Sequence, residues 1–276
     1  MPETYFFPNQ SQETINLATR FRNEVAKLPQ DSRLILYEIL SSCHPTFVPT
    51  TFLEEAGMVI ARQCDREIAF PSPIPMVKLT QVLCGYEELL GRKYCLPGFV
   101  EVERGDVVVD CGAYVGGFSF SAARIAEEIH AFEPEAANFA CLVRNFKEQS
   151  HLSLNAVGLY SDSKTMNLNI SACSVEHSLL IPDDGPPIEI RPIQVLALRD
   201  YCAAKTINRL DFVKIEAEGA ELEIFDGLGS IRPRKLAIDV SAERDGESPA
   251  EQFQQRLKAV GYSVQQRGHV MFARIP

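Results

Sequence analysis

The chain has 276 residues, of which 46% are hydrophobic, and a formal net charge of −10 at pH 7. This size allows one full α/β domain with its own core and a smaller appendage. The negative charge repels a phosphate backbone and an anionic membrane surface, and no basic stretch offsets it locally. The composition therefore disfavours a nucleic-acid substrate and membrane attachment.

The start of the chain and its cysteines indicate the cellular setting. Residues 1–4 lack the basic start of a signal peptide, and no apolar run approaches the roughly 18 residues of a membrane span. The eight cysteines occur singly, without the paired spacing of a zinc or iron–sulfur site. We expect a cytoplasmic protein with reduced thiols and no structural metal.

Residues 1–95 have the pattern of a helical appendage. Apolar residues recur at helical spacing in 34–40 and in 76–90, and Asp31 and Ser32 can cap the first of these helices. Prolines divide the region into separate pieces. We expect several helices and no strands, serving as a substrate cap or as a homodimer surface.

From residue 96 the pattern changes to short β-branched runs that alternate with amphipathic helices, as in a parallel sheet with crossover helices. The predicted strands are 107–110, 129–132, 152–157, 211–216, 235–240, 262–266 and 269–274. The predicted helices are 117–127, 135–149, 220–228 and 249–260. Residues 159–195 interrupt the alternation, and we expect a hairpin near 164–170 and a loop over the active face.

A strand-to-helix turn follows the first of these strands and has the features of a nucleoside site. Gly112 and Gly116 give a turn tight enough for a ligand to touch the backbone. A dinucleotide fingerprint would place its first glycine at Asp110, where a carboxylate repels pyrophosphate. This disfavours an NAD-linked oxidoreductase. A carboxylate instead suits a cofactor with an ammonium group, such as S-adenosylmethionine.

The end of the next strand carries a second acidic residue. Glu133 lies 21 residues beyond Gly112, where a carboxylate can accept hydrogen bonds from both ribose hydroxyls. Taken singly, Asp110 could be a helix cap and Glu133 a surface acid. Their joint occurrence on consecutive strand–helix units favours a nucleoside site.

Four motifs make residues 98–240 resemble the FkbM family of S-adenosylmethionine-dependent methyltransferases. They are Asp110–Ser119, Ala131–Pro134 with Asn138, Phe139 and Asn145, Leu154–Leu159, and Phe212–Glu221. The resemblance implies a class I methyltransferase domain over residues 96–276, an α/β Rossmann-like sheet of seven strands, mostly parallel, with an antiparallel C-terminal strand. Tyr114 and Gly117 stand where the family usually has other residues, and Glu216 stands where aspartate is commoner.

The resemblance and the turn chemistry together give a candidate cofactor site for S-adenosylmethionine. Its residues are Asp110, Gly112, Ala113, Gly116, Ser119, Glu133, Asn138, Ala156 and Val157. By the resemblance, Ala156 and Val157 lie beside the adenine.

Charged residues near the end of the strand 211–216 are the candidate catalytic groups. Period-two alternation places Lys214, Glu216 and Glu218 on one side, at the edge where ligands bind in open α/β sheets. Methyl transfer to a hydroxyl needs the acceptor aligned and its proton removed. Glu216 is the favoured base and Glu218 the second choice. His177, in the expected covering loop, is a further candidate.

Several alternatives remain open at this level. Lys214 and Glu216 could form only a structural ion pair, and a divalent metal could bind to Glu216, Glu218 and Asp239, although no ligand spacing selects it. The leading hypothesis is an O-methyltransferase that acts on a small molecule or a sugar. The alternatives are an N-methyltransferase and an S-adenosylmethionine-binding module without catalysis.

Overall fold

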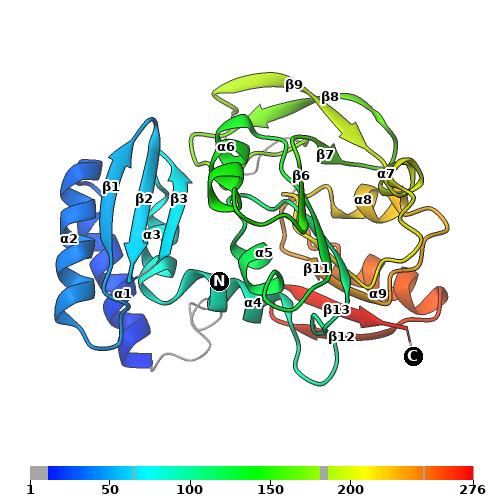
Figure 1. Cartoon of the computed structure of the whole chain (residues 1–276), viewed down its shortest axis with the longest axis horizontal. Helices are drawn as coiled ribbons and strands as arrows, with labels where there is room; N and C mark the ends of the chain where they lie inside the picture. Colours follow the sequence, from blue (N-terminus) through cyan, green and yellow to red (C-terminus); the bar gives the residue numbers. More distant parts are fainter. Residues whose placement is uncertain (1–11, 65, 181–185, 245, 276) are drawn as a thin grey trace. The chain divides into compact units, whose positions relative to one another are not determined.

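The computed structural model describes residues 12–64, 66–180, 186–244 and 246–275 (Figure 1). The chain divides into two units, Met1–Lys93 and Tyr94–Pro276. Within the described ranges, no helix combines the length and the apolar character needed to cross a bilayer.

The first unit contains both helices and strands. Its helices are α1 (Gln12–Val25), α2 (Gln30–Cys43), α3 (Met76–Leu83) and most of α4 (Tyr86–Tyr94). Its strands are β1 (Thr51–Glu55), β2 (Met58–Gln63) and β3 (Arg66–Pro71), which form an antiparallel sheet in the order β1–β2–β3. The prediction of a helical appendage without strands is therefore wrong. Its role as a substrate cap or dimer surface stays a prediction.

The missed strands have a physical explanation in β2. Val59 and Ile60 are both fully buried, so the strand has a continuous apolar run, which periodicity cannot distinguish from a buried helix. The turn before it joins β1 to β2 through Ala56 and Gly57, both with positive φ. Two consecutive residues with positive φ suit the twist of a two-residue hairpin turn. The hairpin of β1 and β2 was therefore overlooked at this turn.

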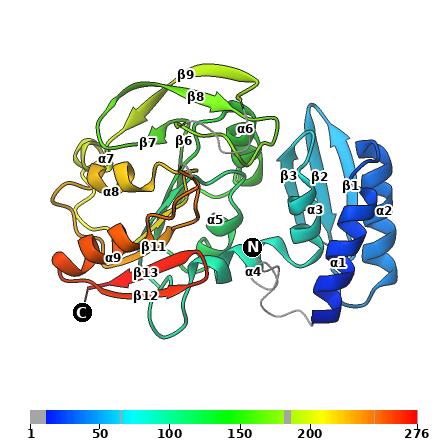
Figure 2. The ribbon, with the colours of Figure 1, turned by 180° about the vertical axis from the view of Figure 1, so that it is seen from behind.

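The second unit is built on a seven-stranded sheet, seen from opposite sides in Figures 1 and 2. Its strands are β4 (Val107–Cys111), β5 (Glu128–Phe132), β6 (Leu152–Asn155), β10 (Phe212–Ile215), β11 (Lys235–Asp239), β12 (Ser263–Arg267) and β13 (Val270–Arg274). They lie in the order β12–β13–β11–β10–β4–β5–β6, with β13 antiparallel to both neighbours and the pairs from β11 to β6 parallel. The predicted class I methyltransferase sheet is confirmed.

Helices cover both faces of this sheet. They are α5 (Gly117–Ala122), α6 (Ala136–Asn145), α7 (Leu198–Lys205), α8 (Glu221–Gly227) and α9 (Ala250–Ala259). One core cluster joins β10 and β11 to α7, α8 and α9 through residues such as Val213, Ile224 and Phe253. A smaller cluster includes Ala131 of β5 and Leu142 of α6. Helix α7 was not predicted, and α5 and α6 are shorter than expected.

The predicted interruption at residues 159–195 is a small second sheet. Its strands are β7 (Gly158–Leu159), β8 (Lys164–Ile170) and β9 (Glu189–Leu196), in the order β7–β9–β8. β8 and β9 pair antiparallel, so the expected hairpin strand at 164–170 is present, although residues 181–185 lie outside the described residues. The sheet lies at the top of the view in Figure 1.

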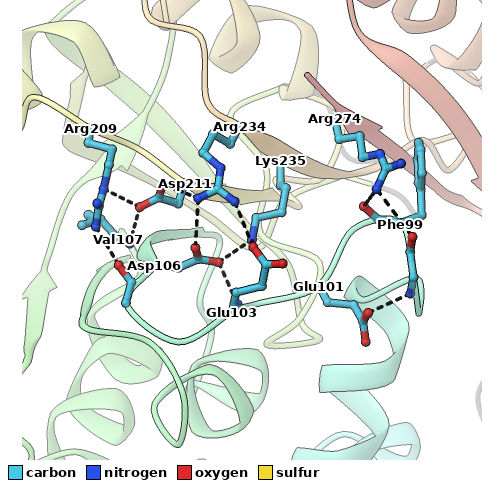
Figure 3. A network of polar contacts seen from close by, with 12 residues as sticks. Phe99, Glu101, Glu103, Asp106, Val107, Arg209, Asp211, Arg234, Lys235 and Arg274 are labelled. Atoms are coloured by element: carbon cyan, nitrogen blue, oxygen red, sulfur yellow. Dashed lines mark hydrogen bonds and ion pairs between the residues drawn. The ribbon is translucent and has the colours of Figure 1, made fainter. Parts of the chain in front are cut away.

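A network of paired charges fixes the amino ends of the central strands (Figure 3). We call it the amino-end network, and its members are Glu103, Asp106, Arg209, Asp211, Arg234 and Lys235. Lys235 Nζ, at the start of β11, lies 2.6 Å from Asp106 Oδ2 and 2.8 Å from Glu103 Oε2. Asp211 accepts a 2.9 Å bond from the Val107 N–H and pairs with Arg234 at 3.2 Å. These contacts set the ends of β4, β10 and β11 against one another.

Candidate active site

Asp110 lies at the buried end of β4 and is held from two directions. Ser119 Oγ of α5 donates to Asp110 Oδ2 at 2.6 Å, and Lys214 Nζ of β10 lies 3.1 Å from Asp110 Oδ1. The carboxylate is fully shielded from solvent. Its immediate partners are therefore the side chains of Ser119 and Lys214.

The glycines of the β4–α5 turn are required by close packing. Gly112 has φ +69°, and a Cβ there would lie 1.8 Å from the backbone oxygen of Glu216. At Gly116, with φ +94°, a Cβ would lie 2.1 Å from the ring of Phe146. A side chain at either position would displace backbone or a core ring. Gly112 therefore brings the turn after β4 directly against the turn after β10.

The N–H of Ala113 also ties this turn to β5. It donates to the carbonyl of Phe132 at 2.9 Å, and the residue is buried. This bond sets the turn beside Glu133, the residue that follows β5.

Glu133 is nearly buried and accepts hydrogen bonds from surrounding backbone. The N–H groups of Tyr114 and Glu135 each donate to it at 2.9 Å, and Asn138 Nδ2 lies 3.5 Å from Oε1. Burial raises the pKa of Glu133 to about 7, against the lowering effect of these donors. Two carboxylate oxygens offer about four acceptor positions, so acceptor capacity remains for a ligand hydroxyl.

Asn138 adds an open acceptor beside Glu133. Its Nδ2 donates to the Ser174 carbonyl at 3.0 Å, while its Oδ1 is buried without a hydrogen-bond partner in the part of the chain that the structure describes. An unpaired buried carbonyl oxygen is costly, and a ligand donor could satisfy it.

Ala156 and Val157 follow the end of β6, one strand beyond β5. The N–H of Glu133 donates to the Asn155 carbonyl at 3.1 Å, which places this edge beside Glu133. Ala156 is exposed and Val157 is half-buried, so together they present an apolar surface next to the carboxylate.

Lys214 connects the two predicted halves of the site. Its Nζ donates to the carbonyls of Cys111 and Gly112, at 3.0 and 2.6 Å, and lies 3.4 Å from Glu216 Oε2. Burial would lower the pKa of Lys214, but the charges of Asp110 and Glu216 outweigh it, and the pKa is raised. Lys214 is therefore an ammonium group that orients neighbours and cannot serve as a base.

The strand that carries Lys214 ends earlier than predicted, so strand alternation does not reach the candidate carboxylates that follow it. β10 ends at Ile215, so Glu216 and Glu218 belong to the following turn, and Glu218 has φ +47°. Period two therefore cannot orient Glu218. The Glu216 side chain is 28% exposed and lies 3.4 Å from Lys214 Nζ, so it can be reached from solvent.

Further acids gather at the same edge of the sheet. We call Asp110, Glu216, Glu218, Glu221, Asp239 and Glu243 the carboxyl-end acids. Burial raises the pKa of Glu221 to about 7, although it accepts bonds from the N–H groups of Ala217 and Gly219. Burial, together with the charges of Glu218, Glu221, Asp239 and Glu216, raises the pKa of Glu243 to about 10.

Two residues of this region were missed in the sequence. Glu243 follows β11 by four positions, and the rule that ligands bind at the carboxyl ends of strands could have included it. Tyr94 lies before the predicted domain boundary, yet its fully buried ring is 5.1 Å from Lys214 Nζ. No local signal distinguishes it from an ordinary core aromatic.

His177 lies in residues 171–180, which we call the strap. Its Nδ1 accepts a 3.1 Å hydrogen bond from the Ser171 N–H, and burial lowers its pKa against the opposing charge of Glu135. The neutral ring therefore carries its proton on Nε2 and acts there as a donor. Among the described residues, no group of three or more His, Cys, Asp or Glu side chains could hold a metal ion.

The sequence model of the methyltransferase FkbM domain matches residues 110–264, which is more than half of the chain. The chain belongs to the FkbM methyltransferase family. It is therefore a methyltransferase, and the matched range begins at Asp110 and includes Glu133, Lys214 and Glu216.

Individual relatives of this FkbM methyltransferase are distant. The 31-O-demethyl-FK506 methyltransferase FkbM of Streptomyces tacrolimicus is 23% identical over 222 residues, covering 68% of this chain and 84% of that protein. A methyltransferase FkbM from Methylobacillus flagellatus KT has 17% identity and a TM-score of 0.47, covering 74% of this chain but only 56% of that one. The precorrin-6y C5,15-methyltransferase of Geobacter metallireducens GS-15 has 14% identity and a TM-score of 0.42, covering 75% and 94%.

Proposed function

We propose that this FkbM-family enzyme transfers the methyl group of S-adenosylmethionine to a hydroxyl of a small molecule or a sugar. One observation carries the proposal: Glu133 and Glu216 follow strands on either side of β4, and the turn after β4 contacts both. Glu133, which can accept hydrogen bonds from a nucleoside, and Glu216, a candidate base, thus lie on either side of the strand end where S-adenosylmethionine would bind.

The donor half of the proposal rests on Glu133, Asn138, Ala156 and Val157. Ionised Glu133 would accept hydrogen bonds from the ribose hydroxyls. The buried Oδ1 of Asn138 would accept a hydrogen bond from another N–H or O–H group of the nucleoside. The apolar surface of Ala156 and Val157 on the adjacent edge suits the adenine. Asp110, Gly112, Ala113, Gly116 and Ser119 would shape the turn that supports the methionine end.

The acceptor half rests on Glu216. In-line transfer gives the acceptor oxygen a positive character that proton loss relieves, so a carboxylate beside it lowers the barrier. Lys214 Nζ, 3.4 Å from Glu216 Oε2, fixes the direction of this carboxylate. Glu218, in the same turn, is the second candidate. His177 has its Nδ1 lone pair occupied by the Ser171 N–H, so it would orient the substrate as a hydrogen-bond donor through Nε2 and would not take the proton.

Two observations favour oxygen over nitrogen as the acceptor. The carboxyl-end acids create a negative field, which would hold a bound amine as ammonium, without the lone pair that attacks the methyl group. The name of the Streptomyces tacrolimicus relative describes a methyltransferase of a 31-O-demethyl compound.

Donor titration and methyl transfer assayed side by side test both halves. Calorimetry with S-adenosylmethionine should show binding to the wild type, and mass spectrometry of a mixture with labelled donor and cell extract should reveal a labelled product. Glu133→Gln should weaken donor binding at least about tenfold, because a neutral amide replaces a charged acceptor. Glu216→Gln should leave donor affinity within about twofold and slow turnover roughly 100-fold.

The two variants also separate the alternatives. A protein that binds the donor but labels nothing would be a binding module without catalysis. Full turnover in Glu216→Gln would remove Glu216 as the base, and wild-type donor affinity in Glu133→Gln would refute the ribose assignment.

A further inference from the structure

The strap, residues 171–180, is fastened to two different turns of the sheet. At one end, Tyr114 Oη lies 3.0 Å from Ser174 Oγ, and Asn138 Nδ2 donates to the Ser174 carbonyl at 3.0 Å. At the other end, Ser178 Oγ donates to the Glu218 carbonyl at 2.7 Å. Because β4 lies between β5 and β10, the strap crosses the carboxyl edge of the sheet over the end of β4.

The residues that hold Ser174 are the same residues that contact Glu133. The Tyr114 N–H donates to Glu133 Oε2 at 2.9 Å, and Asn138 Nδ2 lies 3.5 Å from Glu133 Oε1. Any group bound to Glu133 would therefore lie next to the point where the strap is fastened.

The backbone of Tyr114 supports a specific role for its side chain. Its φ of +54° is uncommon for a bulky residue and costs free energy, roughly 1 kcal/mol or more. The residue is half-buried, and burial raises the pKa of the phenol, so its hydroxyl stays protonated and can donate. The structure thus keeps an unfavourable conformation that directs this hydroxyl at Ser174.

We propose that Tyr114 is a positioning residue for the methyl donor: it fastens the strap at Ser174 over the nucleoside side of the site and so slows exchange of the donor and its product. The inference rests on the proposed function, because it assigns the strap to the S-adenosylmethionine held at Glu133. Ser174 is the partner through which Tyr114 acts.

The test uses substitutions that remove one hydroxyl and keep the packing. Tyr114→Phe, Ser174→Ala and the double variant are compared with the wild type by stopped-flow release of S-adenosylmethionine and S-adenosylhomocysteine. Loss of this one partly buried hydrogen bond should raise each release rate about fivefold. The double variant should be no faster than either single variant, because both remove the same contact.

Steady-state kinetics add a readout that a general loss of stability would not produce. In Tyr114→Phe, KM for the donor should rise about fivefold while kcat changes less than twofold, since the carboxylates near the acceptor are untouched. Tyr262→Phe is the matched control: its buried hydroxyl donates to the Pro233 carbonyl at 2.6 Å near the start of β11, and its removal should leave both constants unchanged.

Hydrogen exchange of the donor-free protein separates this proposal from the proposed function. The Leu180 N–H, which donates to Ser178 Oγ at 3.0 Å, and the Ser178 N–H should exchange faster in Tyr114→Phe than in the wild type. Unchanged exchange and unchanged release with intact donor binding overturn the strap proposal alone. A wild type that binds no donor, with exchange still faster in Tyr114→Phe, overturns the proposed function and the donor role of the strap, while the fastening at Ser174 stands.

Discussion

The two ends of the same parallel sheet handle charge in opposite ways. The amino-end network contains three acids and three bases, and its buried members Asp106, Asp211 and Lys235 all have opposite-charge partners. The carboxyl-end acids are six, and Lys214 forms ion pairs with two of them, Asp110 and Glu216. The balanced end fixes the strands, while the unbalanced end retains free-energy costs that folding alone does not require. Such costs are typical of functional sites.

Glutamates at the two ends show the difference in their proton affinities. At the amino end, Lys235 lowers the pKa of Glu103. At the carboxyl end, burial and neighbouring acids raise the pKa of Glu243 to about 10. The same side chain is thus stabilised as an anion at one end and as a neutral acid at the other.

Removing the lysine of each end gives the largest expected effects. Lys214→Met leaves the fully buried Asp110 without its cation and should lower the free energy of unfolding by about 3–5 kcal/mol in urea titrations. Lys235→Met should cost less, about 2 kcal/mol, because Asp106 keeps the Glu103 N–H at 2.8 Å and Arg234 at 3.9 Å. Equal losses of unfolding free energy would mean that the two ends of the sheet depend equally on their lysines.

Glu243→Gln should stabilise the protein at pH 8 by about 1–2 kcal/mol, a value reduced for partial exposure. The pKa of Glu243 is near 4.5 in the unfolded chain and about 10 in the folded one. The folded state therefore binds the extra proton, and stability falls as pH rises through this window. Urea unfolding of both proteins at pH 5, 6.5 and 8 should show a gap that widens with pH. A constant gap would contradict the prediction.

Donor affinity should fall in acid because of Glu133. With a pKa of about 7, only about a tenth of Glu133 is ionised at pH 6, so the Kd for S-adenosylmethionine should be roughly fivefold higher at pH 6 than at pH 7.5. Calorimetric titration at both values checks this. Glu133→Gln should bind more weakly but show a nearly flat profile, and a wild-type slope in that variant would point to another group.

Arg209→Gln should have the smallest effect. The Arg209 guanidinium lies 2.8 Å from the buried Asp211 but is 57% exposed, and Arg234 and the Val107 N–H also serve that carboxylate. We expect a loss of about 0.5 kcal/mol that shrinks in high salt. Thermal unfolding at low and high ionic strength measures it, and an unchanged methyl-transfer rate would confirm that this end only supports the fold.

The sequence predicted the seven-stranded sheet well because its central strands β4, β10 and β11 are separate buried runs, each followed by a turn. Asp110, Glu133 and Lys214 fall at or next to strand ends, so parallel order alone brings them to one edge. The continuous apolar run of β2 was ambiguous, which hid the sheet of the first unit. Pairing across the sheet, as between Lys235 and Asp106, depends on strand order and could not be read from spacing along the chain.

The contacts of the site beyond the strand ends were less predictable. Glu218 departs from strand alternation through its positive φ, and Glu243 and Tyr94 approach the site from segments with no motif of their own. Long-range packing decides these positions, and a single sequence carries little trace of it.

The contact between Gly112 and the backbone oxygen of Glu216 has a practical consequence for exchanging parts between relatives. No methyl group fits between the two turns, so the backbone path of each turn depends on that of the other. A chimera could take the turn after β10 from a homologue in order to change the methyl acceptor. That turn will keep its original backbone path only if the turn after β4 is taken from the same homologue. The two segments therefore have to be transplanted together when this candidate site is exchanged.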